Sequence, residues 1–280
     1  MNNYKFETTK DSTGAKILLF DSNRAKECCD YSIANGIDII SLYPGIYLGK
    51  DLEPLIPISK FIKGLLLDDK VLYGNLNLFS NLTFLSVPDN GNDTVDLSSF
   101  TKLEMLACKL SNRLIGLESC SNLKSLTVSN YKSKIKDLSA LPSLNNLEHL
   151  SLIKTDITTL QGIERFSNLK KLEMFSASKL ETIAALQALS NSIEEIQVEQ
   201  CKKINDYETL GKVKSLKKII LSESGEIKSL AFVKELPRLE FISFWGTNVL
   251  DGNIKYCEGI NYVGFDNKKH YTHKSEQFKK

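Results

Sequence analysis

Apolar residues along this chain follow two alternating spacings. In the segment 147–175, LEHLSLIKTDITTLQGIERFSNLKKLEMF, they first come at steps of three and two, at Leu147, Leu150 and Leu152. The steps lengthen to about three over residues 157–166, and then the first spacing returns. A helix has a period near 3.6 and a strand a period of 2, so neither alone explains the segment.

The opening phrase, apolar-x-x-apolar-x-apolar, recurs along nearly the whole chain. From Ile37 to Ile260 its mean spacing is about 22 residues, within the 20–29 residues of leucine-rich repeats. Eleven copies begin at Ile37, Ile62, Leu82, Leu103, Leu123, Leu147, Leu169, Ile193, Leu216, Leu239 and Ile260. The sequence therefore resembles the leucine-rich repeat family over about residues 37–266.

This resemblance implies an α/β fold, a leucine-rich repeat solenoid. It would have a curved parallel β-sheet on the concave face and 3-10 or short helical turns on the convex side. The consensus pattern L-x-G-I-x-x-F-x-N-L-x-x-L is most similar to that of the short SDS22-like or internalin-like repeats. We expect the convex return to be lined by Ile157, Leu160, Ile163 and Phe166, by Ile135, Leu138 and Leu141, and by Ile227, Leu230 and Val233.

One position departs from the family pattern. The family usually places Asn or Cys eight residues after the first leucine, where the side chain satisfies backbone groups of the turn. Asn90 and Cys201 fit this pattern. The other copies carry Ser111, Thr155, Ser224 and Thr247, which we expect to bond more weakly, and Tyr131, Ala177 and Lys268, which cannot serve in the same way. The resemblance then implies uneven curvature.

The ends of a solenoid must be covered, and the sequence offers a segment for each end. Residues 1–36 are predicted to form an N-terminal cap, a hairpin over residues 4–20 bent at Gly14, then a helix from Asp21 or Ser22 to about residue 35. Ser22 is the expected N-cap and Gly36 the stop. Residues 37–266 hold about eleven repeats in one continuous stack. Residues 267–280 form a polar tail, part of which would cover the last repeat.

Charge and composition limit the environments and the classes of partner that we expect for this chain. Lys plus Arg number 36 against 34 Asp plus Glu, a formal charge of +2, so we expect neither nucleic acid nor a membrane surface as partner. No apolar run approaches the roughly 20 residues of a membrane span, and the first residues lack a signal-peptide core. A cytoplasmic protein is expected. The six cysteines are irregularly spaced, which favours reduced thiols over disulfides.

Motifs of catalysis and cofactor binding were sought in the sequence. It contains no GxxxxGK[ST], GxSxG or HExxH pattern and no glycine-rich dinucleotide fingerprint. Of the three histidines, His270 and His273 are close together but have no acidic or thiol companions at metal-ligand spacing. We therefore expect no enzyme activity, no cofactor and no metal.

The residues that alternate with the core leucines of each strand should project from the concave face, where solenoids commonly bind proteins. Several are aromatic, and aromatic residues are enriched at the centres of protein interfaces. Glu195 and Glu199 add an acidic pair that could meet a basic patch. The expected partner-binding residues are His149, Phe175, Glu195, Glu199, Phe241, Trp245 and Tyr262.

These features favour a non-enzymatic protein-binding module that engages another protein through its concave face. One role that fits is a bacterial immunity or antitoxin-type protein, which masks the active surface of a toxin. The alternatives are a regulatory adaptor of an enzyme such as a phosphatase, as the SDS22-like resemblance implies, or an enzyme with an unrecognised site.

Overall fold

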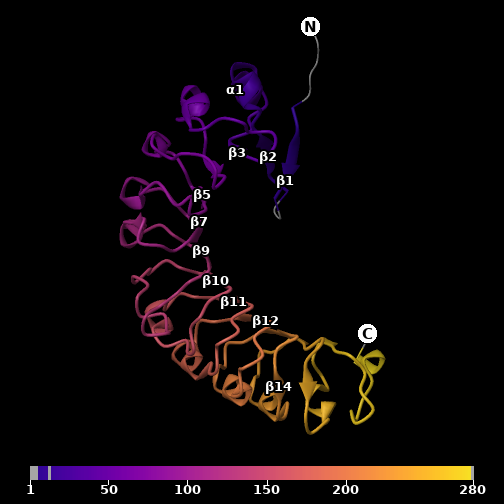
Figure 1. Ribbon diagram of the computed structural model, residues 1–280. Coiled ribbons are helices and arrows are strands. Elements are labelled where there is room, and N and C mark those ends of the chain that lie inside the picture. Colours follow the sequence, from indigo (N-terminus) through magenta and orange to yellow (C-terminus); the bar gives the residue numbers. More distant parts are fainter. Residues whose placement is uncertain (1–5, 12–13, 279–280) are drawn as a thin grey trace. The chain divides into compact units, whose positions relative to one another are not determined.

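The computed structural model describes residues 6–11 and 14–278. It divides into two compact units, residues 1–126 (unit 1) and residues 127–280 (unit 2). Residues 4–5 and 12–13 of the predicted hairpin, and the last two residues of the predicted tail, lie outside the described residues. Each unit is a stack of short strands with 3-10 turns on the other side (Figure 1), so the leucine-rich repeat fold is confirmed.

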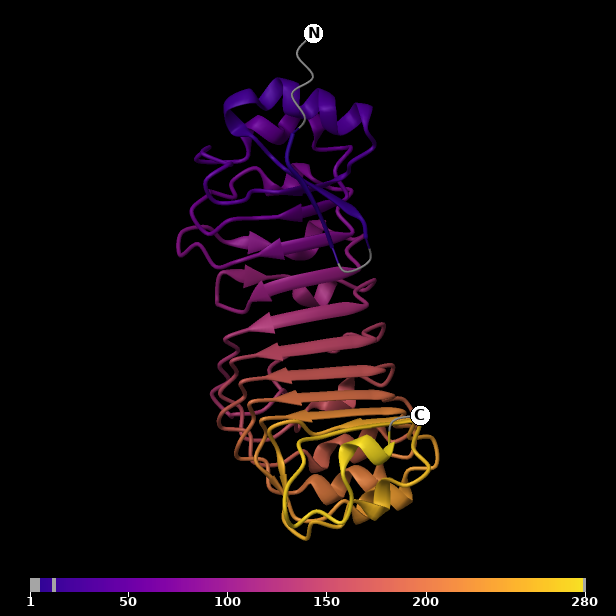
Figure 2. The same cartoon turned by 90° about the vertical axis from the view of Figure 1, so that its right-hand side faces the viewer.

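Parallel strands stacked in a constant register form the sheet of unit 2 (Figure 2). Along the sheet these strands are β10 (His149–Ile153), β11 (Lys171–Phe175), β12 (Glu195–Glu199), β13 (Lys218–Ser222), β15 (Phe241–Ser243) and β17 (Tyr262–Gly264). A separate parallel pair consists of β14 (Glu226–Ile227) and β16 (Asn248–Val249). The strand β9 (Ser125–Ser129) includes the residues at which the two units meet in sequence.

The return segments of unit 2 form 3-10 turns, because a step of three suits a helix with three residues per turn. These turns are η6 (Ile163–Arg165), η7 (Ala184–Leu189), η8 (Tyr207–Lys212), η9 (Ala231–Glu235) and η10 (Ile254–Cys257), and η11 (Ser275–Phe278) follows the last strand. Their apolar residues pack against the strand leucines, and Leu150, Ile163 and Phe166 are fully buried. The apolar phrase and the steps of three therefore fill one core between the strands and the turns.

One expected core residue is not in the core. Ile135 is 63% exposed, so its predicted place in the convex return is wrong. Tyr131 is buried in that repeat, and its hydroxyl donates to the Asp137 carbonyl at 3.1 Å. Lys136 then takes a left-handed backbone conformation (φ 61°), and the buried return begins only at Leu138.

Buried hydroxyl groups replace the usual asparagine in neighbouring repeats of unit 2. The amide of Cys201 donates to Ser224 Oγ at 3.1 Å, and the amide of Ser224 donates to Thr247 Oγ1 at 2.9 Å. The hydroxyls donate in turn, Ser224 to Ser222 O at 2.6 Å and Thr247 to Leu221 O at 2.8 Å. These are hydrogen bonds of ordinary length, so the hydroxyls of Ser224 and Thr247 bond the backbone of the turn in place of the asparagine.

Unit 1 begins with a hairpin and continues with parallel strands. The antiparallel pair β1 (Thr8–Lys10) and β2 (Lys16–Leu19) is followed by β3 (Ile39–Ser41), β4 (Gly64–Leu66), β5 (Phe84–Val87) and β7 (Met105–Lys109), with β6 (Val95–Asp96) pairing β8 (Leu114–Ile115) separately. Its helices are η1 (Ser22–Arg24), α1 (Ala25–Ala34), η2 (Glu53–Ile58), η3 (Leu76–Leu78), η4 (Leu97–Ser99) and η5 (Leu117–Ser119).

The predicted N-cap of the first helix is one residue off. Asp21 begins the helical segment, and its carboxylate accepts a hydrogen bond from the amide of Asn23 at 3.0 Å. The hydroxyl of Ser22 instead accepts from the amide of Leu48 at 2.8 Å. A carboxylate at this position also faces the positive end of the helix dipole, which favours Asp over Ser here.

Residues 266–278 pack on the last repeat of unit 2. The Tyr271 hydroxyl accepts from the amide of Val249 at 2.9 Å, and Thr272 Oγ1 accepts from the amide of Ile254 at 3.0 Å. The Phe278 ring lies 5.9 Å from the ring of Phe265, which is fully buried. The polar tail therefore supplies both hydrogen-bond acceptors and an aromatic side chain to the end of the core.

Within the described residues no helix is long and apolar enough to cross a membrane. All six cysteines are buried thiols outside any disulfide, as the spacing predicts. Burial raises the pKa of the Cys201 thiol to about 11 and that of the Cys257 thiol to about 12, which keeps both protonated near neutral pH.

Candidate partner-binding face

The outward side chains of the unit 2 strands form three rows, which together we call the sheet face. Strand register aligns the first row as His149, Lys171, Glu195, Lys218, Phe241 and Tyr262. The second row is Ser151, Glu173, Gln197, Ile220, Ser243 and Gly264. The third row is Ile153, Phe175, Glu199 and Ser222, with Trp245 just beyond the end of β15.

A charged cluster lies at the first two strands of this face. The Glu173 carboxylate accepts a hydrogen bond from His149 Nε2 at 2.9 Å and lies 2.6 Å from the Lys171 ammonium. The hydrogen bond from His149, joined by Lys171, lowers the pKa of Glu173 to about 2 against the opposing effect of its burial. Glu173 is therefore ionised at any physiological pH and holds the imidazole and the ammonium in place.

Aromatic side chains occupy the other end of the sheet face. The rings of Phe241 and Tyr262 are stacked, with centroids 4.3 Å apart and planes 8° apart. Trp245 and Tyr262 expose 44% and 45% of their surface, far more than a core aromatic residue would. A Cβ atom added at Gly264 would lie 2.9 Å from the Tyr262 ring and 3.1 Å from Trp245 Nε1. Both side chains therefore converge over this glycine.

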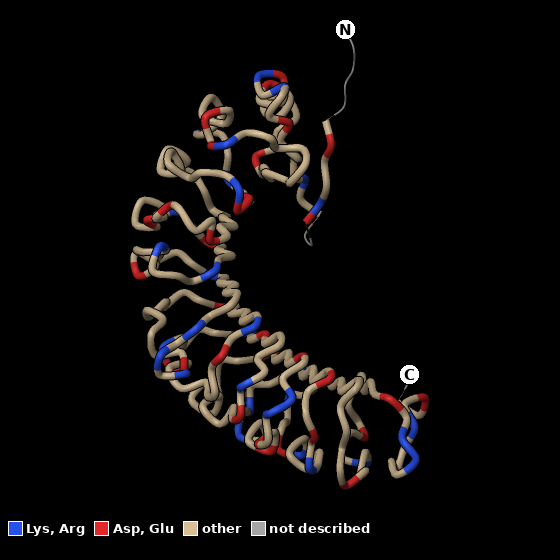
Figure 3. The backbone as a smooth tube through the Cα atoms, in the orientation of Figure 1, with Lys and Arg blue, Asp and Glu red and all other residues tan. Residues whose placement is uncertain are grey.

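The carboxylates of the sheet face differ in their partners. Glu195 lies 3.7 Å from the Lys218 ammonium, which is also 5.4 Å from the Phe241 ring centroid. The half-buried Glu199 forms no ion pair with any described residue. Figure 3 shows acidic and basic residues interspersed along the backbone of unit 2.

The structure places all seven predicted site residues on the sheet face of unit 2. It joins Phe241 to Tyr262 by stacking and brings Trp245 beside them, whereas Phe175 and Glu199 lie in the third row. Sequence reasoning did not select Glu173, which organises His149, nor Gly264, which leaves room for the rings. The alternation of each strand assigns both to the second row, and that position was the available signal.

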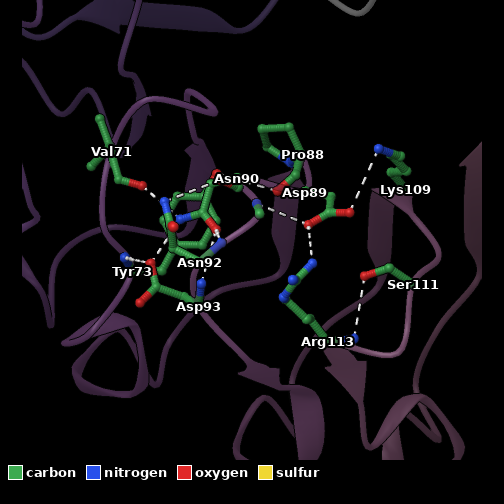
Figure 4. A network of polar contacts seen from close by, with 11 residues as sticks. Val71, Tyr73, Pro88, Asp89, Asn90, Asn92, Asp93, Lys109, Ser111 and Arg113 are labelled. Carbon is green, nitrogen blue, oxygen red and sulfur yellow. Dashed lines mark hydrogen bonds and ion pairs between the residues drawn. The ribbon is translucent and has the colours of Figure 1, made fainter.

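Unit 1 carries a second polar cluster, in the loop after β5 (Figure 4). Asp89 lies 3.5 Å from the Lys109 ammonium and 3.7 Å from Arg113, and it accepts a hydrogen bond from the Gly91 amide. That backbone hydrogen bond first, and then the two cations, lower the pKa of Asp89.

Asn90 and Asp93 complete the same loop. Asn90 Nδ2 donates to the Val71 carbonyl at 2.9 Å and to Asp93 Oδ2 at 2.7 Å, and that oxygen also accepts from the Tyr73 amide at 2.8 Å. Asn90 thus satisfies turn backbone, as the family resemblance implies for its position. The polar groups of this loop bind one another, and the cluster holds the turn in shape.

One cavity of unit 1 has an acidic residue in its lining whose role is structural. This cavity, of about 310 Å3, is lined by Tyr73, Asn77, Asp96, Ser99 and Phe100, among others. The Asp96 carboxylate accepts from the Ser98 amide at 2.9 Å as the N-cap of η4, which is a structural role. Across the described ranges, no group of three or more His, Cys, Asp or Glu residues could hold a metal ion.

Comparison with known proteins finds matches only among solved structures. No model of a protein family matches the sequence, and no curated protein matches it. The internalin InlJ domain from Listeria monocytogenes is 16% identical with a TM-score of 0.45, over 82% of this chain and 58% of that one. Internalin InlF from the same species is 16% identical with a TM-score of 0.41, over 79% and 78%. The leucine-rich repeat domain of the type III effector XopL is 19% identical with a TM-score of 0.47, over 94% and 80%.

These structures are leucine-rich repeat proteins, and this chain has repeats of the same kind. The chain spans 58% of the length of the InlJ structure. The likeness concerns the repeat fold, and the function must be argued from the residues of this chain.

Proposed function

We propose that this chain is a non-enzymatic module that binds another protein through the sheet face of unit 2. The observation that carries the proposal is the exposed aromatic cluster of Phe241, Trp245 and Tyr262. A tryptophan and a tyrosine that each expose nearly half of their surface, side by side on one face, provide a large apolar contact area. Side chains of this kind are the usual anchors of protein interfaces.

The surroundings of the cluster support binding of a protein. The charged groups of His149, Lys171 and Glu173 lie on the same face and are held by one another, so they offer preorganised polar contacts. Apolar anchors with a polar rim are the usual composition of a protein interface. The roles that the sequence favours, a toxin-masking immunity protein or an adaptor of an enzyme, both require such a face.

The experiment compares alanine variants of two residues of similar exposure. Immobilised full-length chain is used to capture partners from a lysate of the source cells, and the captured protein is then purified for affinity measurement. Trp245→Ala should weaken its binding by about 30-fold, because truncating an aromatic anchor costs about 2 kcal/mol or more. Leu250→Ala is the control, because Leu250 is 49% exposed but follows β16 and lies outside the sheet face.

Stability is measured on both variants by urea unfolding. Each should change the free energy of unfolding by about 0.5 kcal/mol or less, since both side chains are exposed. Equal binding by Trp245→Ala and the unaltered chain would move the partner site away from this cluster. Equal weakening by Leu250→Ala would show that exposed apolar surface, and not this face, is what the captured protein recognises.

A further inference from the structure

The chain contains two Asn–Gly pairs, Asn35–Gly36 and Asn90–Gly91, and both lie in unit 1. In such a pair the backbone nitrogen of the glycine can attack Cγ of the asparagine, because glycine has no side chain to obstruct the approach. The glycine nitrogen gives up its proton and bonds Cγ, the Cγ–Nδ2 bond breaks, and the amide nitrogen leaves with a proton as ammonia. Water then opens the cyclic imide, which gives aspartate or isoaspartate. The contacts that hold the two reacting groups therefore decide how fast each pair reacts.

The side chain of Asn90 is held at both of its polar atoms (Figure 4). Nδ2 donates to the Val71 carbonyl at 2.9 Å and to Asp93 Oδ2 at 2.7 Å. Oδ1 accepts from the backbone amides of the second and third residues that follow Asn90, both at 3.0 Å. The attacking nitrogen is held as well, because the Gly91 amide donates to Asp89 Oδ1 at 3.0 Å. Several hydrogen bonds must therefore break before the nitrogen of Gly91 can reach Cγ of Asn90.

Asn35 is the C-cap of helix α1 and has fewer contacts. It is exposed, and within the described residues its side chain makes one hydrogen bond, from Nδ2 to the Tyr31 carbonyl at 2.8 Å. The Gly36 amide donates to the Ile33 carbonyl at 3.2 Å. No heavy atom beyond the chain neighbours of Gly36 lies within 4 Å of a Cβ placed there, so the backbone has open space to rotate. Helix ends fray, so this pair reaches the reactive geometry more readily than the second pair does.

We propose that the folded chain deamidates spontaneously at Asn35, with water as the co-reactant, and that the turn around Asn90 protects the second pair from the same reaction. The product at Asn35 is an exposed carboxylate at the end of a helix. A carboxylate at position 90 would put an acceptor oxygen where Nδ2 now donates, 2.7 Å from Asp93 Oδ2 and 2.9 Å from the Val71 carbonyl. Three acceptors would then face one another without a donor, which destabilises the turn.

The protected pair is therefore the one whose modification would break a turn of unit 1. Both pairs lie outside the sheet face of unit 2, so the inference is independent of the proposed function and can fail or succeed separately from it.

The test measures both positions in one sample of the full-length chain. The chain is incubated at mildly alkaline pH, folded in one series and in concentrated urea in the other, and mass spectrometry of its peptides follows the conversion of each asparagine with time. In the folded chain the conversion should be about tenfold or more faster at Asn35 than at Asn90, because opening the turn breaks several hydrogen bonds at once. In urea the two rates should converge, because the reacting pair is the same and the turn is lost.

Equal rates at the two positions of the folded chain would overturn the proposal. A difference of the same size in urea would overturn it as well, because the neighbouring residues in sequence, and not the fold, would then set the rates.

Asp93→Ala tests whether the turn is the protecting element. The substitution removes an acceptor of Asn90 Nδ2, so conversion of Asn90 in the folded chain should become about threefold or more faster while that of Asn35 stays unchanged. Asp96→Ala is the matched control, because the Asp96 carboxylate also accepts from a backbone amide of unit 1, that of Ser98 at 2.9 Å, and caps a different turn. It should leave Asn90 protected. No acceleration by Asp93→Ala, or equal acceleration by both substitutions, would show that the contacts of this turn are not what protects Asn90 and would overturn the proposal.

Discussion

Glu173 offers a quantitative test of the charged cluster on the sheet face. Its side chain is only 15% exposed, and its pKa falls from 4.5 to about 2 because His149 and Lys171 bond its ionised form. A fall of this size corresponds to about 3 kcal/mol between the two protonation states. Because the carboxylate keeps some contact with solvent, the expected contribution is smaller, about 2 kcal/mol at neutral pH. Glu173→Gln should therefore lower the free energy of unfolding by about that amount at pH 7.

The pH dependence gives the sign of the effect. A carboxylate whose pKa is lower in the folded chain contributes stability that is fully present above its unfolded pKa of about 4.5. The contribution is lost as the pH falls from about 4.5 toward 2, where the folded chain also takes up the proton. The difference in unfolding free energy between the unaltered chain and Glu173→Gln should shrink over this range.

The assay is urea unfolding followed by circular dichroism at several pH values between 7 and the acid limit of the folded chain. Using the difference between two chains cancels the other carboxylates, which titrate in both. Glu199→Gln is the control on the same face, because Glu199 has no ion pair among the described residues, and it should change stability by about 0.5 kcal/mol or less. A Glu173→Gln difference that stays constant or grows as the pH falls would refute the reasoning.

Three further predictions concern the repeats themselves. Thr247→Val should cost about 2–4 kcal/mol in urea unfolding, since it leaves the buried Ser224 amide without its acceptor and the Leu221 carbonyl without its donor; a cost below about 1 kcal/mol would contradict this role. Gly162→Ala should cost about 2 kcal/mol or more in the same assay, because Gly162 has a φ of +95° and a Cβ there would lie 2.6 Å from the Ser139 amide nitrogen; a neutral effect would contradict it. We also propose that residues 37–266 form one continuous stack, so a fragment of residues 1–165 should expose an uncapped core and aggregate in gel filtration; a soluble fragment with a cooperative unfolding transition would refute this proposal.

The sequence alone predicted the repeat fold, because every short repeat carries the same spacing of apolar residues. Alternation within a strand likewise assigns Phe241, Trp245 and Tyr262 to the outward side, and the structure places them there. The same local reasoning failed at Ile135, which is exposed, whereas Tyr131 of the same repeat is buried. It also failed at the first helix, where two adjacent residues could each have been the N-cap.

The tertiary structure decided which outward residues act together. Glu173 is bonded by His149, 24 positions away in sequence, whereas Glu199 on the next strand is left without an ion pair among the described residues. The two rings that converge over Gly264 likewise come from different repeats. A repeat period fixes which positions become neighbours across strands, but the bonds between them depend on side-chain conformations and on the space that each neighbour leaves. Those depend on packing between repeats, which is settled only when the chain is folded.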